Sequence, residues 1–185
     1  MRKIKICLFT SLFYDSSLES VALQISKLGF EAVEIPVWWG SKHLSLEGNY
    51  ISRGKNLLTK LKLLGLSVPA INNARSGQLV LGPLDESTDS WVPKEYSNDK
   101  VKFAIQSMHR AAEAASELEI PIVVGFVGSP QWDKYYIYPP GNADIHERHW
   151  QLFADRWGPI LDYFLNKYTQ YVYMHLNVFY PFSHG

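Results

Sequence analysis

The chain has 185 residues, enough for one sizeable core, and its 46% hydrophobic and 14% aromatic content is typical of a globular protein. Lysine plus arginine and aspartate plus glutamate number 18 each, so the charge gives no reason to expect nucleic acid or an anionic membrane as a partner. Lys5 interrupts the first apolar run, which excludes a signal peptide, and no apolar stretch approaches the roughly 20 residues of a membrane helix. We therefore expect a cytoplasmic protein. The single cysteine, Cys7, excludes an internal disulfide, and its strand-like surroundings predict a small core residue.

Strand and helix patterns alternate four times and are followed by a fifth strand. The predicted strands are, in chain order, residues 3–10, 30–36, 66–71, 120–126 and 170–176. Apolar residues at helical spacing predict helices at about residues 17–28, 57–64, 101–118 and 149–164. Gly29 and Gly65 follow the first two helices, where C-terminal caps are expected. Pro69 predicts irregular pairing in the third strand.

Long loops follow the second, third and fourth predicted strands. Residues 72–96 are predicted to form a loop of about 25 residues, a length that is often functional. Both an open doubly wound sheet and part of a (β/α)₈ barrel fit this order of elements. The open sheet usually carries a Gly-rich turn after its first strand, but that turn here reads "SLFYDSS".

Barrel enzymes instead build their sites from long loops at the carboxyl ends of the strands. We therefore predict an α/β fold that is a partial (β/α)₈ TIM barrel, with about four βα units and a fifth strand. These units form a single domain over residues 1–185, the N-terminal part of a barrel that takes roughly 250 residues when complete.

Several stretches at βα spacing resemble a known family. They are "LGFEAVEIPVW" (28–38), "NNARSGQLVLGPLDESTDSWVP" (72–93), "GFVGSPQW" (125–132), "YPP" (138–140) and "FADRWGPILD" (153–162). Together they are similar to the sugar phosphate isomerase/epimerase family, whose members have a xylose-isomerase-like TIM barrel. The resemblance extends from Lys5 to about Tyr173.

This resemblance implies aldose–ketose isomerisation or epimerisation of a sugar or sugar phosphate, by proton transfer next to a carbonyl. In intact members a divalent ion (manganese, magnesium, cobalt or zinc) polarises the substrate. Paired glutamates move the proton. The first metal-binding glutamate comes from the fifth strand and the other ligands from later strands.

Two positions depart from the family pattern. Where members read roughly "FALEVHPTE" in the fifth strand, this chain reads "VYMHLNVFY", which puts His175 at the metal-binding glutamate. Ala74 replaces an active-site histidine of the family's "SNHLVGQLV". We therefore expect a truncated chain that lacks the metal centre and is catalytically inactive, with His175 as a poor metal ligand.

The alternative function is a barrel fragment that acts as an oligomerising or sugar-binding module. Five strands cannot close a barrel, so two strand edges would stay unpaired. We expect a homo-oligomer or a completing fragment to cover them.

Glu34, at the end of the second strand, is the candidate catalytic residue. As a carboxylate in an apolar strand it needs a partner, and two interpretations stay open: an acceptor for a substrate hydroxyl, or a buried group paired with a basic side chain or a backbone donor. The candidate substrate-binding residues are neutral, aromatic or small: Trp38, Asn73, Gln78, Gly125, Ser129 and Trp132. Gly125 and Gly128 would let the backbone approach a ligand closely.

Two further features are interpreted structurally. Asp85, Glu86 and Asp89 form an acidic cluster, which we interpret as a solvated loop or as helix caps rather than a metal site. His109 lies in the polar stripe of the third helix and is predicted to be exposed.

Overall fold

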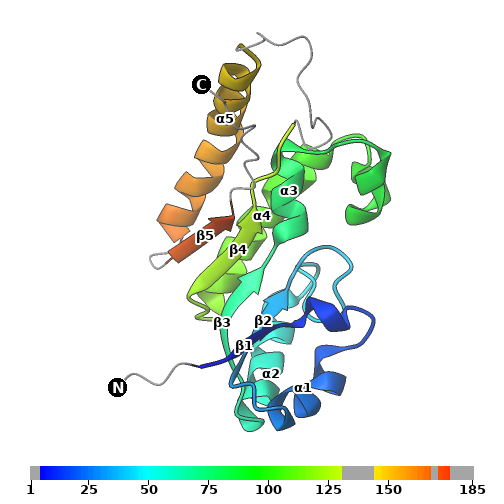
Figure 1. Ribbon diagram of the computed structural model, residues 1–185, viewed down its shortest axis with the longest axis vertical. Helices are drawn as coiled ribbons and strands as arrows, with labels where there is room; N and C mark the ends of the chain where they lie inside the picture. Colours follow the sequence, from blue (N-terminus) through cyan, green and yellow to red (C-terminus); the bar gives the residue numbers. More distant parts are fainter. Residues whose placement is uncertain (1–4, 131–143, 168–170, 176–185) are drawn as a thin grey trace, which may run out of the picture.

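Five parallel strands form one sheet in the order β1-β2-β3-β4-β5 (Figure 1). They are β1 (Cys7–Phe9), β2 (Ala32–Pro36), β3 (Ser67–Asn72), β4 (Ile122–Phe126) and β5 (Tyr171–His175). The computed structural model describes residues 5–130, 144–167 and 171–175, with only the backbone of residues 144–146 and 171–175. The strand order never reverses, as it does in a doubly wound sheet. The predicted partial TIM barrel is therefore confirmed.

Four long helices connect the strands or follow them. They are α1 (Leu18–Lys27), α2 (Tyr50–Leu63), α4 (Lys100–Glu117) and α5 (Asp144–Lys167). Each packs on the next, α1 on α2, α2 on α4, and α4 on α5, as in the outer ring of a barrel. In the described part of the chain, no helix is long and apolar enough to cross a membrane.

Side-chain caps and glycines fix the helix ends. The side chains of Ser17, Asn49 and Asp99 accept hydrogen bonds from backbone amides in the first turns of α1, α2 and α4. Gly29 and Gly65 have φ angles of 89° and 75°, a conformation that favours glycine. The predicted C-terminal caps are therefore confirmed.

The two faces of the sheet differ in burial. Val33, Ile35, Ile71 and Val123 are fully buried in the core with the helices. On the opposite face, Phe9 pairs with Glu34, and both are half-buried. Cys7 is exposed, which corrects the prediction of a core cysteine. Successive side chains of β1 point to opposite faces of the sheet, and that of Cys7 points to the less covered face.

Pairing between β2 and β3 is irregular, as predicted from Pro69. Ala32 pairs with Ser67, but two residues later Glu34 pairs with Ala70, three residues further along. Pro69 has no N–H for the ladder, so the register shifts around it.

Residues 72–96 are folded rather than a structureless loop. They contain the helix α3 (Ala74–Leu81) and the 3₁₀ turns η2 (Glu86–Trp91) and η3 (Lys94–Tyr96), which follow η1 (Thr10–Phe13) in chain order. The side-chain oxygen of Asn72 accepts a hydrogen bond from the amide of Ala74 at 2.9 Å and so starts α3 directly after β3. The prediction of a loop was therefore wrong for most of this segment.

A carboxylate joins three helices on the outside of the sheet. Glu113 of α4 accepts hydrogen bonds from the hydroxyls of Tyr50 of α2, at 2.9 Å, and Tyr163 of α5, at 2.6 Å. His109 stacks on Tyr163 with ring centroids 4.0 Å apart. It is half-buried, which corrects the prediction of an exposed histidine. α5 had not been expected to cover this stripe of α4.

We expect Glu113→Gln to lower the free energy of unfolding by about 1–2 kcal/mol, because it weakens two hydrogen bonds to a charged acceptor. Denaturant titration measures this change. The control is Glu117→Gln on the same helix, whose carboxylate is 61% exposed and 3.9 Å from Lys55. It should change stability by no more than about 0.5 kcal/mol. Equal effects of the two variants would contradict the prediction.

The pH dependence gives an independent readout. The Tyr163 hydroxyl, together with that of Tyr50, holds the pKa of Glu113 below its usual 4.5. A lowered pKa in the folded state contributes stability that is present above the unfolded-state pKa and is lost as pH falls through the folded-state pKa. Below about pH 4.5, wild type should therefore lose stability more steeply than Glu113→Gln.

Candidate functional site

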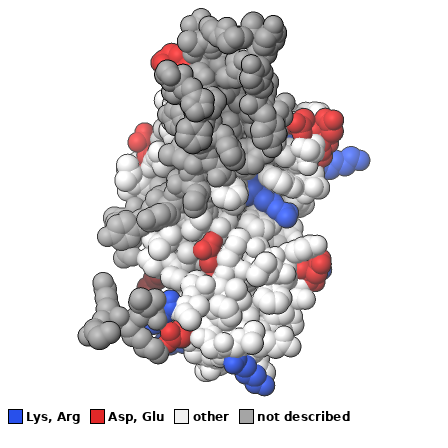
Figure 2. Space-filling view, viewed as in Figure 1, with Lys and Arg blue, Asp and Glu red and all other residues white. Residues whose placement is uncertain are grey.

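A pocket of about 360 Å³ lies at the carboxyl ends of the strands. Phe9, Asn72 and Phe126 end β1, β3 and β4, and Trp38 follows β2. The complete lining is Phe9, Ser11, Tyr14, Trp38, Asn72, Ala74, Arg75, Gln78, Trp91 and Phe126. Barrel enzymes carry their sites at this end. In the view of Figure 2, isolated acidic and basic groups emerge from a mainly uncharged surface.

Glu34 is joined to the pocket through Asn72. The Nδ2 of Asn72 donates to Oε1 of Glu34 at 2.6 Å, and Oδ1 of Asn72 accepts from the amide of Ala74 at 2.9 Å. Since the amide oxygen is held by α3, the NH₂ group must face the carboxylate. Of the two interpretations left open, pairing with a basic side chain does not occur among the described residues. Oε2 of Glu34 receives no hydrogen bond from that part of the chain and can accept one from a ligand.

Arg75 forms the basic part of the pocket. Its guanidinium lies over the Trp38 ring, 4.8 Å from the centroid, and over the Trp91 ring at 5.6 Å. Burial lowers the pKa of Arg75, an effect opposed by Tyr14 nearby. The two aromatic contacts hold the side chain at the pocket wall.

The position of α3 depends on two glycines. A Cβ on Gly77 would lie 2.3 Å from the carbonyl oxygen of Phe126, and one on Gly128 would lie 2.1 Å from the carbonyl oxygen of Gln78. Neither contact is possible for a larger residue unless the backbone moves. Gly128, which the sequence predicts to approach a ligand closely, lies against the end of α3. The packing sets where Ala74, Arg75 and Gln78 line the pocket.

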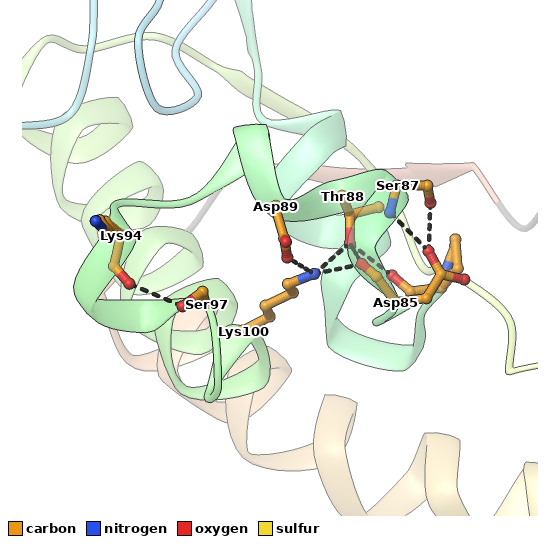
Figure 3. A network of polar contacts seen from close by, with 8 residues as sticks. Asp85, Ser87, Thr88, Asp89, Lys94, Ser97 and Lys100 are labelled. Carbon is orange, nitrogen blue, oxygen red and sulfur yellow. Dashed lines mark hydrogen bonds and ion pairs between the residues drawn. The ribbon is translucent and has the colours of Figure 1, made fainter.

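A buried lysine fixes the segment that carries Trp91 (Figure 3). Lys100, at the start of α4, is 4% exposed. Its Nζ forms an ion pair with Oδ1 of Asp89 at 2.6 Å and donates to Oγ1 of Thr88 at 3.1 Å and to the carbonyl oxygen of Asp85. The side chain of Asp85 caps η2 by accepting from the amide of Ser87. Asp85 therefore has the capping role that we inferred for the acidic cluster, whereas the ion pair of Asp89 with Lys100 was not predicted.

The predicted binding residues do not all meet at the pocket. Trp38 and Gln78 line it, and Gln78 also donates from Nε2 to the carbonyl oxygen of Gly82 at 3.0 Å. Asn73 is fully buried and donates to the carbonyl oxygen and hydroxyl of Ser107 on α4, away from the lining.

The remaining predicted residues lie in or after β4 and β5. Gly125 lies within β4, and the amide of Ser129 donates to the carbonyl oxygen of Gly82; neither lines the pocket. Trp132 lies outside the described residues. The backbone of His175 ends β5 opposite Phe126, and its side chain lies outside the description, so its role as a metal ligand stays a prediction.

Sequence reasoning missed Asn72 and Arg75. Asn72 was hidden because the preceding strand and the helix start could not be placed next to each other from the pattern alone. Arg75 did leave a signal: it is a basic residue in an otherwise neutral "NNARSGQ" stretch, next to the Ala74 at which the family pattern changes.

The described residues do not provide a metal-binding set. Over residues 5–130 and 147–167, whose side chains are described, no group of three or more histidine, cysteine, aspartate or glutamate residues could hold a metal ion. Glu34 does not itself line the pocket but contacts the lining residue Asn72 through Oε1, and among the described residues no carboxylate belongs to the lining.

A family model of the xylose isomerase-like TIM barrel matches residues 23–175. The chain belongs to this family. The match includes β2 to β5 and all the pocket residues except those before α1. No curated protein matches the sequence significantly.

Solved structures share this xylose isomerase-like fold at low sequence identity. A 3-keto-D-glucoside 4-epimerase from E. coli has a TM-score of 0.61 and 15% identity, with 93% of this chain and 56% of that one covered. A D-tagatose 3-epimerase-like protein has a TM-score of 0.57 and 17% identity, with 92% and 52% covered. An L-ribulose 3-epimerase has a TM-score of 0.55 and 14% identity, with 94% and 49% covered. The chain thus spans about half the length of these structures.

We expect Gly77→Ala to destabilise the protein by about 1–3 kcal/mol, because its Cβ would meet the Phe126 carbonyl and push α3 away. Inside a helix this substitution is normally stabilising, so the sign is diagnostic. Asn56→Ala in α2 is the control, because Asn56 is exposed inside a helix and alanine has the higher helix propensity. Thermal unfolding should rank wild type between the two variants, and equal shifts would refute the close packing.

We also expect Lys100→Met to loosen the segment from Asp85 to Trp91, because the three oxygen contacts of its ammonium are lost. Hydrogen exchange of the amides in this segment should speed up by about tenfold or more. Lys102→Met, with an exposed side chain on the same helix, is the control. Unchanged exchange in Lys100→Met would show that the ammonium does not hold the segment.

Proposed function

We propose that the pocket binds a sugar or sugar phosphate and forms the polyol-recognising part of a site for aldose–ketose isomerisation or epimerisation. The observation that carries this proposal is the Glu34–Asn72 pair, held at 2.6 Å beside a pocket at the carboxyl ends of the strands. A sugar presents hydroxyls as both donors and acceptors. The free carboxylate oxygen of Glu34 suits the donors, and charged acceptors make the stronger hydrogen bonds.

The aromatic residues of the pocket suit the carbon faces of a sugar. Phe9 and Trp38 are packed edge to face, with ring centroids 6.2 Å apart. A volume of about 360 Å³ lies at the small end of ligand pockets. The epimerases named above have this fold, and the sugars in their names support the same class of ligand.

Proton transfer next to a carbonyl needs a base and an electrophile in fixed geometry. Among the described residues, Glu34 is the one carboxylate joined to the pocket, and the side chains there do not fit a metal centre. We therefore assign no metal-dependent step to them. We propose that these 185 residues bind the sugar but do not catalyse its conversion. The second candidate function is therefore that of a sugar-binding module.

We expect Glu34→Gln to weaken binding of a neutral ketose by about tenfold, because a neutral acceptor replaces the charged one while the Asn72 contact survives. Isothermal titration with D-ribulose, D-tagatose and D-fructose measures this loss. Glu95→Gln, with an exposed side chain outside the pocket lining, is the control.

No binding of any ketose, neutral or phosphorylated, to the wild type would contradict the proposed function, as would equal binding of the ketoses to Glu34→Gln. Turnover is assayed in parallel with added Mn²⁺ and metal analysis of the purified protein. Ketose turnover together with bound metal would refute binding without catalysis and leave sugar recognition in place.

A further inference from the structure

Arg75 is a cation in the pocket that has no acidic partner among the described residues. Of the other arginines, Arg53 donates from Nη2 to the carbonyl oxygens of Ser45 and Glu47, both at 2.7 Å, and Arg156 donates from Nη1 to the carbonyl oxygen of Val80 at 2.8 Å. Within the described part of the chain, Arg75 makes neither a hydrogen bond nor an ion pair through its guanidinium. Its five N–H donors are therefore available to a ligand.

The contacts that Arg75 does make orient it without using those donors. The rings of Trp38 and Trp91 attract the cation through their π faces, and all three side chains line the same pocket. Trp38 is 7% exposed, and the segment of Trp91 is fixed by the buried Lys100. The guanidinium is thus held by rigid neighbours, which reduces the entropy lost when a ligand binds.

Charge supports the same interpretation. A partly buried cation is unfavourable unless it is paired, and arginine remains protonated at any physiological pH. Lys100, a second buried cation, forms an ion pair with Asp89 at 2.6 Å. The segment after β3 therefore contains an acidic side chain that pairs with a cation of structural importance. Arg75 also lies in the first turn of α3, where the helix dipole favours an anion.

We propose that Arg75 binds an oxyanion of the substrate, so that the ligand is a sugar carrying a phosphate or carboxylate group. This inference rests on the proposed function, which places the sugar in the same pocket. Asn72 and Arg75 are three residues apart at the start of α3, which puts hydroxyl recognition at the sheet and anion recognition at the helix. The planar guanidinium fork matches both anions.

Isothermal titration of the wild type with paired ligands tests this inference. One arm compares D-ribulose 5-phosphate with D-ribulose, and the other compares D-glucuronate with D-glucose. A charge-assisted contact predicts that at least one anionic sugar binds about tenfold more tightly than its neutral partner. The arm that shows the preference identifies the anion as phosphate or carboxylate.

Arg75→Met should remove this preference, so that the anionic sugar binds no more tightly than its neutral partner. Arg75→Lys should keep part of it, because charge remains but the fork is lost. Arg148→Met, exposed on α5, is the matched control and should behave as wild type. NMR gives a further readout. The Nε–Hε signal of Arg75 is assigned as the one that is missing from the spectrum of Arg75→Lys. In the wild type this signal should shift on titration with the preferred anionic sugar.

The outcomes separate the two proposals. Binding of neutral and anionic sugars with equal affinity, or a preference that survives in Arg75→Met, would overturn the assignment of Arg75 and leave the proposed function standing. Binding of neither kind of sugar would overturn the proposed function and this inference together.

Discussion

The close approach of α3 to the end of β4 is the constraint on which the pocket depends. Backbone carbonyl oxygens lie 2.3 Å and 2.1 Å from the positions that a Cβ on Gly77 and on Gly128 would take, so α3 can come this close only because both residues are glycine. Arg75 reaches the aromatic rings, and Gln78 reaches the carbonyl of Gly82, from that position. A small shift of the helix would therefore change the site without touching any residue that binds a ligand.

Two cations, Lys100 and Arg75, have different environments and therefore different roles. Lys100 is almost fully buried, contacts three oxygens and fixes η2, whereas Arg75 contacts two rings and, among the described residues, no acceptor. Desolvation penalises both charges, but within the described part of the chain only the lysine is paired with an acidic side chain. Both residues lie in or directly after the segment that follows β3, which contains acidic side chains. The lack of an acidic partner for Arg75 among the described residues therefore supports a role in ligand binding.

Much of the fold could be predicted from the sequence, because each of the features that were predicted correctly depends on residues close together in the chain. Glycine caps, the irregularity at Pro69 and the alternation of strand and helix all have local causes. α3 was missed because eight residues with a central glycine have weak helical periodicity, and its stability comes from packing against β4. Asn73 shows the same limit for the site: its amide faces α4 and its neighbour Asn72 faces Glu34, a difference set by one residue of register.

That register also explains why a carboxylate is tolerated in β2. The face of the sheet that carries Phe9 and Glu34 is less covered than the face that packs against the helices. Cys7 on the adjacent strand β1 lies on the same face and is exposed. Glu34 needs only one protein donor there, because solvent or a ligand can reach the rest of the carboxylate. The amide of Ala74 holds the oxygen of Asn72, so the NH₂ group of Asn72 faces Glu34. The start of α3 therefore orients the partner of Glu34 and, one residue after Ala74, places the cation Arg75 at the pocket. Hydroxyl recognition and charge recognition in this pocket are therefore two consequences of the same helix start.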